Sequence, residues 1–137
     1  MRNGWPPNAR PLPSETAVPT LLIVEDEEIL GKNIRRALEK LGHAVSLAPT
    51  CGDAERLFSE LNPDLTLMDL RLPGADGIDT LRAARKHGFS GPVIVMTAFG
   101  EIKTAVAAMK LGAHDYITKP FDMDELRLTI ESSLRLC

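Results

Sequence analysis

Residues 64–74 read Asp64-Leu65-Thr66-Leu67-Met68-Asp69-Leu70-Arg71-Leu72-Pro73-Gly74, a short apolar run that ends at a carboxylate. Asn62-Pro63 precedes the run and Pro73-Gly74 follows it, so turn residues bound it on both sides. The pattern predicts a buried strand with Asp69 at its exit. Because ligands collect at the carboxyl ends of strands in open parallel sheets, Asp69 is a candidate site residue. Taken alone, this acid has an equal alternative role in capping a turn.

Strand and helix patterns alternate on both sides of this stretch. Continuous or alternating apolar runs predict strands over 21–24, 43–47, 65–69, 92–96 and 114–117. Apolar residues at helical spacing predict helices over 30–41, 50–61, 77–87, 102–109 and 122–134. Strict alternation requires parallel strands with right-handed crossovers and helices on both faces. This pattern predicts an α/β fold, a doubly wound five-stranded parallel sheet with five helices, and we take its strand order to be 2-1-3-4-5, flavodoxin-like.

Two predicted helices begin with capping patterns, and one helix has an unusual composition. Thr50 is followed by Asp53, and Asp122 by Glu125, the spacing of a capping box. The helix over 102–109 is rich in alanine and has a weakly apolar face, formed by Ile102, Ala105, Val106 and Met109. Because few large apolar contacts hold such a helix, we expect it to be the mobile one.

Composition excludes several classes of protein. The 137 residues carry 16 Lys and Arg against 19 Asp and Glu, a net charge of −3, so the basic footprint of a nucleic-acid binder or a membrane-surface protein is missing. No apolar run is long enough to span a membrane, and the amino terminus lacks the apolar core of a signal peptide. The two cysteines, Cys51 and Cys137, are far apart, which favours a reducing cytoplasm, with both residues simply packed or exposed rather than catalytic.

The amino-terminal segment differs from the rest of the chain. Residues 1–19 contain five prolines and no periodic apolar face, so we expect a disordered Pro-rich tail. The folded domain is expected over residues 20–137.

Three acids and a lysine follow the predicted strands. Glu25-Asp26 follow the first strand, Asp69 ends the third, and Lys119 follows the fifth. In the expected strand order the first and third strands are neighbours, so three carboxylates share one crevice. Such crowding is costly unless a cation intervenes, and hard oxygen ligands suit Mg²⁺. The sequence therefore predicts a magnesium site.

The same edge has the groups needed to accept a phosphoryl group. Asp69 can attack, Lys119 and the Thr97 hydroxyl can hold phosphoryl oxygens, and the backbone amide of Ala98 is a further donor. Each residue also has an ordinary structural explanation, such as acids at a helix start, a β-branched strand end or a turn at Lys119-Pro120. Their joint placement favours the functional interpretation.

Four motifs carry a family resemblance. They are LLIVEDEE (21–28), LTLMDLRLPGADGI (65–78), VIVMTAFG (93–100) and DYITKPF (115–121). With them, residues 20–136 resemble a response-regulator receiver domain of bacterial two-component signalling. The run from Met96 to Leu126 is most similar to receivers of nitrogen-regulation-type enhancer-binding transcriptional activators. Those continue into ATPase and DNA-binding modules, so this chain is either such a domain excised or a stand-alone receiver.

The resemblance implies a metal site and a phosphoacceptor. Asp69 would be phosphorylated. Mg²⁺ would be bound by Asp26, Asp69 and the backbone carbonyl of Arg71, with Glu25 acting largely through water. Glu25 stands where many family members carry Asp, which affects only the detailed metal geometry.

The resemblance also implies a switch and partners. Phosphoryl would come from a phosphohistidine of a sensor histidine kinase, and Thr97 and Lys119 would contact it. Thr97 would move toward the phosphoryl group, and Tyr116 would fill the vacated space. Phosphorylation would then drive homodimerisation or docking of an output module, through the face of the last strand and the helices beside it. Lys119-Pro120 would be cis, and Arg71 and Phe99 would control access of water.

The resemblance makes the domain a phosphorylation-controlled signalling unit that catalyses only its own phosphorylation and dephosphorylation. One rival is a non-phosphorylated protein-interaction domain that keeps the receiver fold. Another is a phosphatase of the haloacid-dehalogenase type, which needs a second Asp two residues after the nucleophile, where Arg71 stands.

Overall fold

The computed structural model of the chain describes residues 18–72, 75–86, 89, 91–98 and 100–135. The predicted tail, apart from Val18 and Pro19, lies outside the described residues, as do Phe99 and Cys137. Within the described residues no helix combines the length and the apolar character needed to cross a lipid bilayer.

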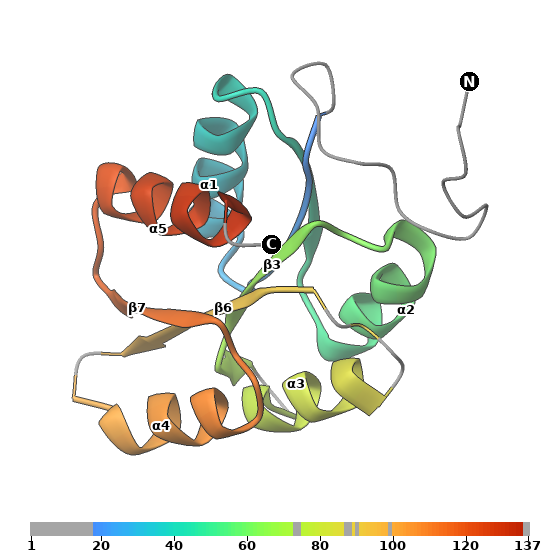
Figure 1. Cartoon of the computed structure of the whole chain (residues 1–137), viewed down its shortest axis with the longest axis vertical. Coiled ribbons are helices and arrows are strands. Elements are labelled where there is room, and N and C mark those ends of the chain that lie inside the picture. The colour runs from blue at the N-terminus through green and yellow to red at the C-terminus, as the bar shows by residue number, and fades with distance from the viewer. Residues whose placement is uncertain (1–17, 73–74, 87–88, 90, 99, 136–137) are drawn as a thin grey trace.

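A five-stranded parallel sheet forms the centre of the molecule (Figure 1). Its strands are β1 (Thr20–Val24), β2 (Ala44–Ala48), β3 (Leu65–Asp69), β6 (Val93–Ala98) and β7 (Asp115–Lys119). Their order is β2-β1-β3-β6-β7, which confirms the expected order. The carboxyl ends of all five strands therefore lie at one edge, with β1 and β3 adjacent at the point where the winding reverses.

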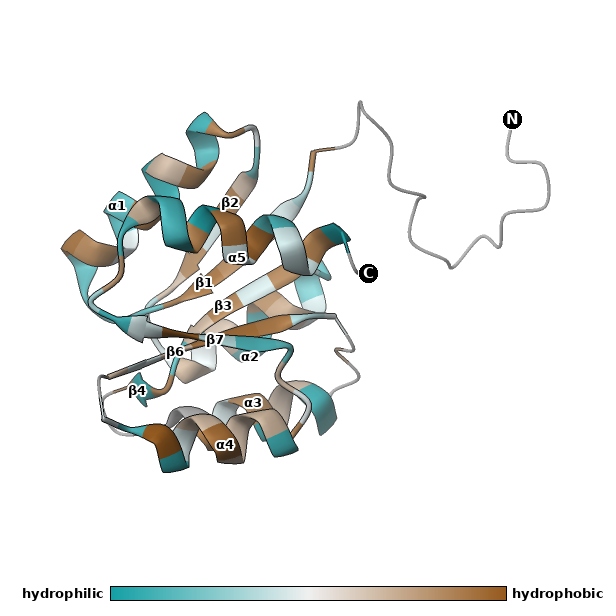
Figure 2. Ribbon diagram, turned by 60° about the vertical axis from the view of Figure 1, so that its left-hand side comes forward, coloured by the Kyte–Doolittle hydropathy of each residue, from teal (hydrophilic) through white to brown (hydrophobic). Residues whose placement is uncertain are grey.

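The two faces of the sheet carry separate apolar cores. The helices are α1 (Glu28–Lys40), α2 (Cys51–Leu61), α3 (Gly77–Lys86), α4 (Ile102–Lys110) and α5 (Met123–Arg135). Along β1 the buried side chains alternate: Leu21 and Ile23 pack with α1 and α5, whereas Leu22 and Val24 pack with α2, α3 and α4. Figure 2 shows α1 and α5 on one side of the sheet and α3 and α4 on the other. This arrangement explains why β1 is a continuous apolar run.

One feature of the secondary structure was not predicted, and another agrees with expectation. Arg71–Leu72 (β4) and Ala75–Asp76 (β5) form a two-stranded antiparallel ladder that was not predicted, because two residues are too few to show a period. In α4 only Ala105 and Ala108 are buried, while Ile102, Val106 and Met109 are exposed. The few large apolar contacts expected for this helix are confirmed.

Both predicted capping patterns form hydrogen bonds. The Thr50 hydroxyl accepts the Asp53 backbone N–H at 3.1 Å, and the Asp122 carboxylate accepts the Glu125 backbone N–H at 2.7 Å. These bonds satisfy amides that a helix start otherwise leaves without a partner.

Candidate functional site

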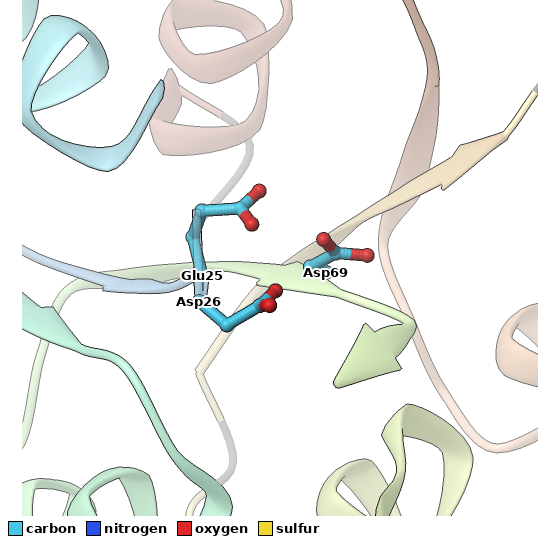
Figure 3. Close-up of side chains that lie close together, drawn as sticks. All are labelled: Glu25, Asp26 and Asp69. Carbon is cyan, nitrogen blue, oxygen red and sulfur yellow. The ribbon is translucent and has the colours of Figure 1, made fainter. Parts of the chain in front are cut away.

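Three carboxylates meet where β1 and β3 end. Glu25 and Asp26 directly follow β1, and Asp69 is the last residue of β3. One carboxylate oxygen from each lies within 4.8 Å of the other two, and Figure 3 shows the three side chains together. We call these three residues the acidic cluster. Glu25 and Asp69 are buried, whereas Asp26 is partly exposed. The strand order that brings β1 beside β3 therefore assembles the predicted cluster.

Lys119 reaches the acidic cluster from the last residue of β7. Its Nζ donates to Glu25 Oε1 at 2.7 Å and to Asp69 Oδ2 at 2.8 Å. A third acid, Glu27, lies 3.7 Å from the same nitrogen. The peptide bond that follows, Lys119-Pro120, is cis, as predicted. A single cation thus bridges the two buried members of the cluster.

Burial and hydrogen bonding shift the pKa of Glu25 and the pKa of Lys119 from their ordinary values. Burial raises the pKa of Glu25 to about 7, even though hydrogen bonds from Lys119 and from the Glu27 backbone lower it. Burial on its own lowers the pKa of Lys119, but its hydrogen bonds to Asp69 and Glu25 outweigh burial and raise it. Lys119 therefore stays protonated, and the ionised form of Glu25 remains costly. A further cation at this position would lower that cost.

The donor set of the cluster suits a hard divalent cation. Three carboxylates supply oxygens alone, and the partly exposed Asp26 leaves room for the waters that Mg²⁺ retains. The Arg71 backbone N–H donates to Asp69 Oδ1 at 2.8 Å, so the chain turns back toward the carboxylate directly after β3. The residues present therefore fit Mg²⁺. The Arg71 carbonyl as a ligand stays a prediction.

The predicted hydroxyl and switch residues lie on β6 and β7. Met96 pairs with Asp69 across the sheet, so Thr97 lies one residue beyond the position of Asp69 on the neighbouring strand and is followed by Ala98. The Thr97 hydroxyl donates to the Glu101 carbonyl at 3.4 Å. Tyr116 is 50% exposed on β7. The Thr97 hydroxyl is therefore bonded to the residue that precedes α4, and the Tyr116 side chain is exposed.

Two residues in or near the site were missed by sequence reasoning. Glu27 belongs to the acidic run after β1, and its backbone N–H donates to Glu25 Oε2 at 3.0 Å. Glu101 accepts from Thr97 and forms an ion pair with Arg71. An acid just before a predicted helix was the only signal for Glu101, and that pattern is common at helix starts.

Comparison with known proteins independently supports the resemblance to receiver domains. A family model described as the response regulator receiver domain matches residues 21–131. The regulatory protein AtoC of Escherichia coli (strain K12) is 42% identical over 121 residues, which cover 88% of this chain and 26% of that protein. The two-component response regulator PhoP of Pseudomonas aeruginosa is 38% identical over 115 residues, covering 84% and 51%.

Solved structures agree with the sequence relatives. The crystal structure of the receiver domain of NtrX from Brucella abortus has a TM-score of 0.81 at 32% identity, and covers 85% of this chain and 99% of that one. The chain spans about a quarter of AtoC and half of PhoP. Since the family model covers well over half of the chain, and the fold and motifs agree with it, this chain belongs to the response regulator receiver domain family.

Proposed function

We propose that Asp69 accepts a phosphoryl group from a phosphohistidine of a sensor histidine kinase. The observation that supports this most strongly is the bridge from Lys119 to Asp69 and Glu25, beside the partly exposed Asp26. A carboxylate held next to a fixed ammonium group and further acids is arranged for phosphoryl transfer, where catalysis is mostly positioning and neutralisation of charge.

The transfer uses the Asp69 carboxylate as nucleophile. A carboxylate oxygen forms a bond to phosphorus as the phosphorus–nitrogen bond of the phosphohistidine breaks, and the electron pair of that bond leaves with the imidazole nitrogen. Lys119 offsets charge on one phosphoryl oxygen, while the Thr97 hydroxyl and the Ala98 backbone amide donate to others. Asp26, Asp69 and the Arg71 carbonyl, with Glu25 through water, would hold Mg²⁺, which when bound would supply positive charge to the phosphoryl oxygens.

The same chemistry sets a switch. When Thr97 turns to the phosphoryl group, it leaves the Glu101 carbonyl, and the exposed Tyr116 ring can move into the vacated space. A groove of about 330 Å³ lies beside these residues, with α4 and β7 contributing Ile102, Val106, Met109 and Tyr116. This face would bind a second copy of the chain or an output module. Light scattering of the protein saturated with Mg²⁺ and beryllofluoride tests dimerisation, since an unchanged mass contradicts it.

We also propose a biological role for the domain in controlling an output module. Because its relatives are named as regulatory proteins, some of them transcriptional, we expect this receiver to control an output module, and a transcriptional one in particular. The cytoplasmic location expected from the cysteines stays a prediction.

Intact-mass spectrometry tests the acceptor role. The parent and Asp69→Asn are incubated with Mg²⁺ and acetyl phosphate, with Asp79→Asn, an exposed acid on α3, as the control. We expect one phosphoryl adduct in the parent and the control, dependent on Mg²⁺ and missing from Asp69→Asn. No adduct on the folded parent would refute the proposal and favour a non-phosphorylated interaction domain. Repeated turnover of a phosphate ester would favour the phosphatase.

A further inference from the structure

The Arg71 side chain connects the phosphoacceptor loop to α4. Arg71 follows Asp69 by two residues and lies in β4, and Glu101 directly precedes α4. Arg71 Nη2 and Glu101 Oε1 form an ion pair, although the two residues are far apart in sequence. The guanidinium side chain is 70% exposed and the carboxylate side chain 21% exposed. A change at the acceptor loop can therefore reach the start of α4 through this pair.

A second contact holds the same residue. The backbone carbonyl of Glu101 accepts from the Thr97 hydroxyl at 3.4 Å, while its side chain pairs with Arg71. Both partners adjoin the acceptor site, one on β4 and one on β6. Since α4 buries only Ala105 and Ala108, these two contacts add to the few that hold its first turn. Glu101 makes no side-chain capping bond to α4 in this arrangement.

We infer that the Arg71–Glu101 ion pair is a latch that holds α4 in its unphosphorylated position and opens when Arg71 turns to the phosphoryl group on Asp69. This inference rests on the function proposed above. A guanidinium can donate two parallel hydrogen bonds to a phosphoryl group, which carries more charge than one carboxylate. The Arg71 side chain is 70% exposed, so its guanidinium can exchange partners at little desolvation cost, whereas the Glu101 carboxylate, whose side chain is 21% exposed, needs a new partner when the pair opens.

Opening of the latch would release α4 in one event. Phosphorylation draws Thr97 from the Glu101 carbonyl and Arg71 from the Glu101 carboxylate, so both contacts are lost together. The freed Glu101 carboxylate then lies at the start of α4. There it can accept hydrogen bonds from unpaired backbone N–H groups, and the helix dipole stabilises its negative charge. The latch is thus a two-position element, with a partner for each charge in both positions.

Glu101→Gln tests the latch because it removes the charge and keeps the backbone carbonyl. The readout is the amide NMR chemical shift of Ala105 and Ala108, between endpoints set by the parent free and saturated with Mg²⁺ and beryllofluoride. We expect these amide shifts in the free variant to move toward the saturated endpoint, because the ratio of the populations of the two α4 positions changes by about two- to five-fold. Glu60→Gln, which breaks an exposed ion pair within α2, is the control and should not shift the α4 amides.

Affinity for beryllofluoride separates the latch from a plain surface ion pair. With its latch broken, Glu101→Gln should bind about two- to five-fold tighter than the parent. Arg71→Gln loses the latch and the phosphoryl contact together, so it should not bind tighter, and Arg71→Lys should recover part of the parent's behaviour. Unmoved α4 amides in Glu101→Gln, or equal tightening in both neutral variants, would overturn the inference. A parent that does not bind beryllofluoride at all would instead overturn the proposed function.

Discussion

Glu25 is buried beside Asp69, and both accept hydrogen bonds from Lys119. Burial raises the pKa of Glu25 from 4.5 to about 7, so this residue's contribution to stability is full below about pH 4.5 and is lost as the pH rises through about 7. Without Mg²⁺, Glu25→Gln should therefore be more stable than the parent at about pH 8, by about 1 to 3 kcal/mol, and this gain should shrink by about pH 5.

Urea unfolding with a chelator present, at about pH 8 and about pH 5, measures this gain in the free energy of unfolding. Glu39→Gln, an exposed acid on α1, is the control and should change the free energy of unfolding by less than about 0.5 kcal/mol at either pH. A gain for Glu25→Gln that is the same at both pH values would show that ionisation of Glu25 is not its cause.

Replacing Lys119 should lower the stability of the protein, the opposite of the effect expected for Glu25→Gln. Replacing it with Met leaves Glu25 and Asp69 without their shared cation, so Lys119→Met should lose about 1 to 3 kcal/mol of stability in a chelator at about pH 8. The loss should be smaller at about pH 5, where a carboxylate can take up a proton instead. Lys32→Met, which breaks an exposed pair with Glu28, should lose less than about 0.5 kcal/mol. Equal losses in the two variants would contradict the bridging role.

At the scale of elements, the start of α2 depends on one side chain. The Thr50 hydroxyl accepts the Asp53 N–H and donates to Asp53 Oδ2 at 3.0 Å. Thr50→Ala should therefore lower the free energy of unfolding by about 1 kcal/mol. Ser59→Ala, an exposed position within the same helix, should stay within about 0.5 kcal/mol of the parent. Thermal or urea unfolding measures both, and equal effects would show that the cap contributes nothing.

The elements also show what local patterns can and cannot predict. The capping bonds at Thr50 and Asp122 were predictable because every participating atom lies within three residues. The ladder of β4 and β5 was not, since each strand has only two residues. The exposure of Ile102 was hidden for another reason: an apolar residue at helical spacing shows which helix face it shares, but not whether another element covers that face.

At the scale of the whole molecule, two cores on opposite faces of the sheet hold the fold together. Leu81 of α3 belongs to one core and Ile130 of α5 to the other, and both are fully buried. Leu81→Ala and Ile130→Ala should each cost about 2 to 5 kcal/mol in a single unfolding transition. Leu128→Ala, 56% exposed on α5, should cost less than about 1 kcal/mol. A cost for only one of the two core variants would mean that one face does not support the fold.

Strand order determines which contacts of the site could be predicted from the sequence. Strand order alone brings Glu25, Asp26 and Asp69 together. Alternation of strands and helices predicts the parallel sheet, and the order 2-1-3-4-5, taken as the expected one, then places β1 beside β3. The contacts of Glu101 with Arg71 and Thr97 were not predictable, because they depend on how far α4 stands from β4 and on the side-chain rotamers chosen there. The meeting of acids at strand ends follows from topology, whereas the Arg71–Glu101 ion pair depends on packing.

Chemical trapping of the acceptor tests the central claim most directly. The protein is phosphorylated with acetyl phosphate and Mg²⁺ and reduced with borohydride, which converts an aspartyl phosphate to homoserine, and the modified residue is located by tandem mass spectrometry. We predict homoserine at position 69 alone, and only when Mg²⁺ is present. Homoserine at Asp26 or at an exposed acid such as Asp79, with Asp69 intact, would contradict the assignment of the acceptor.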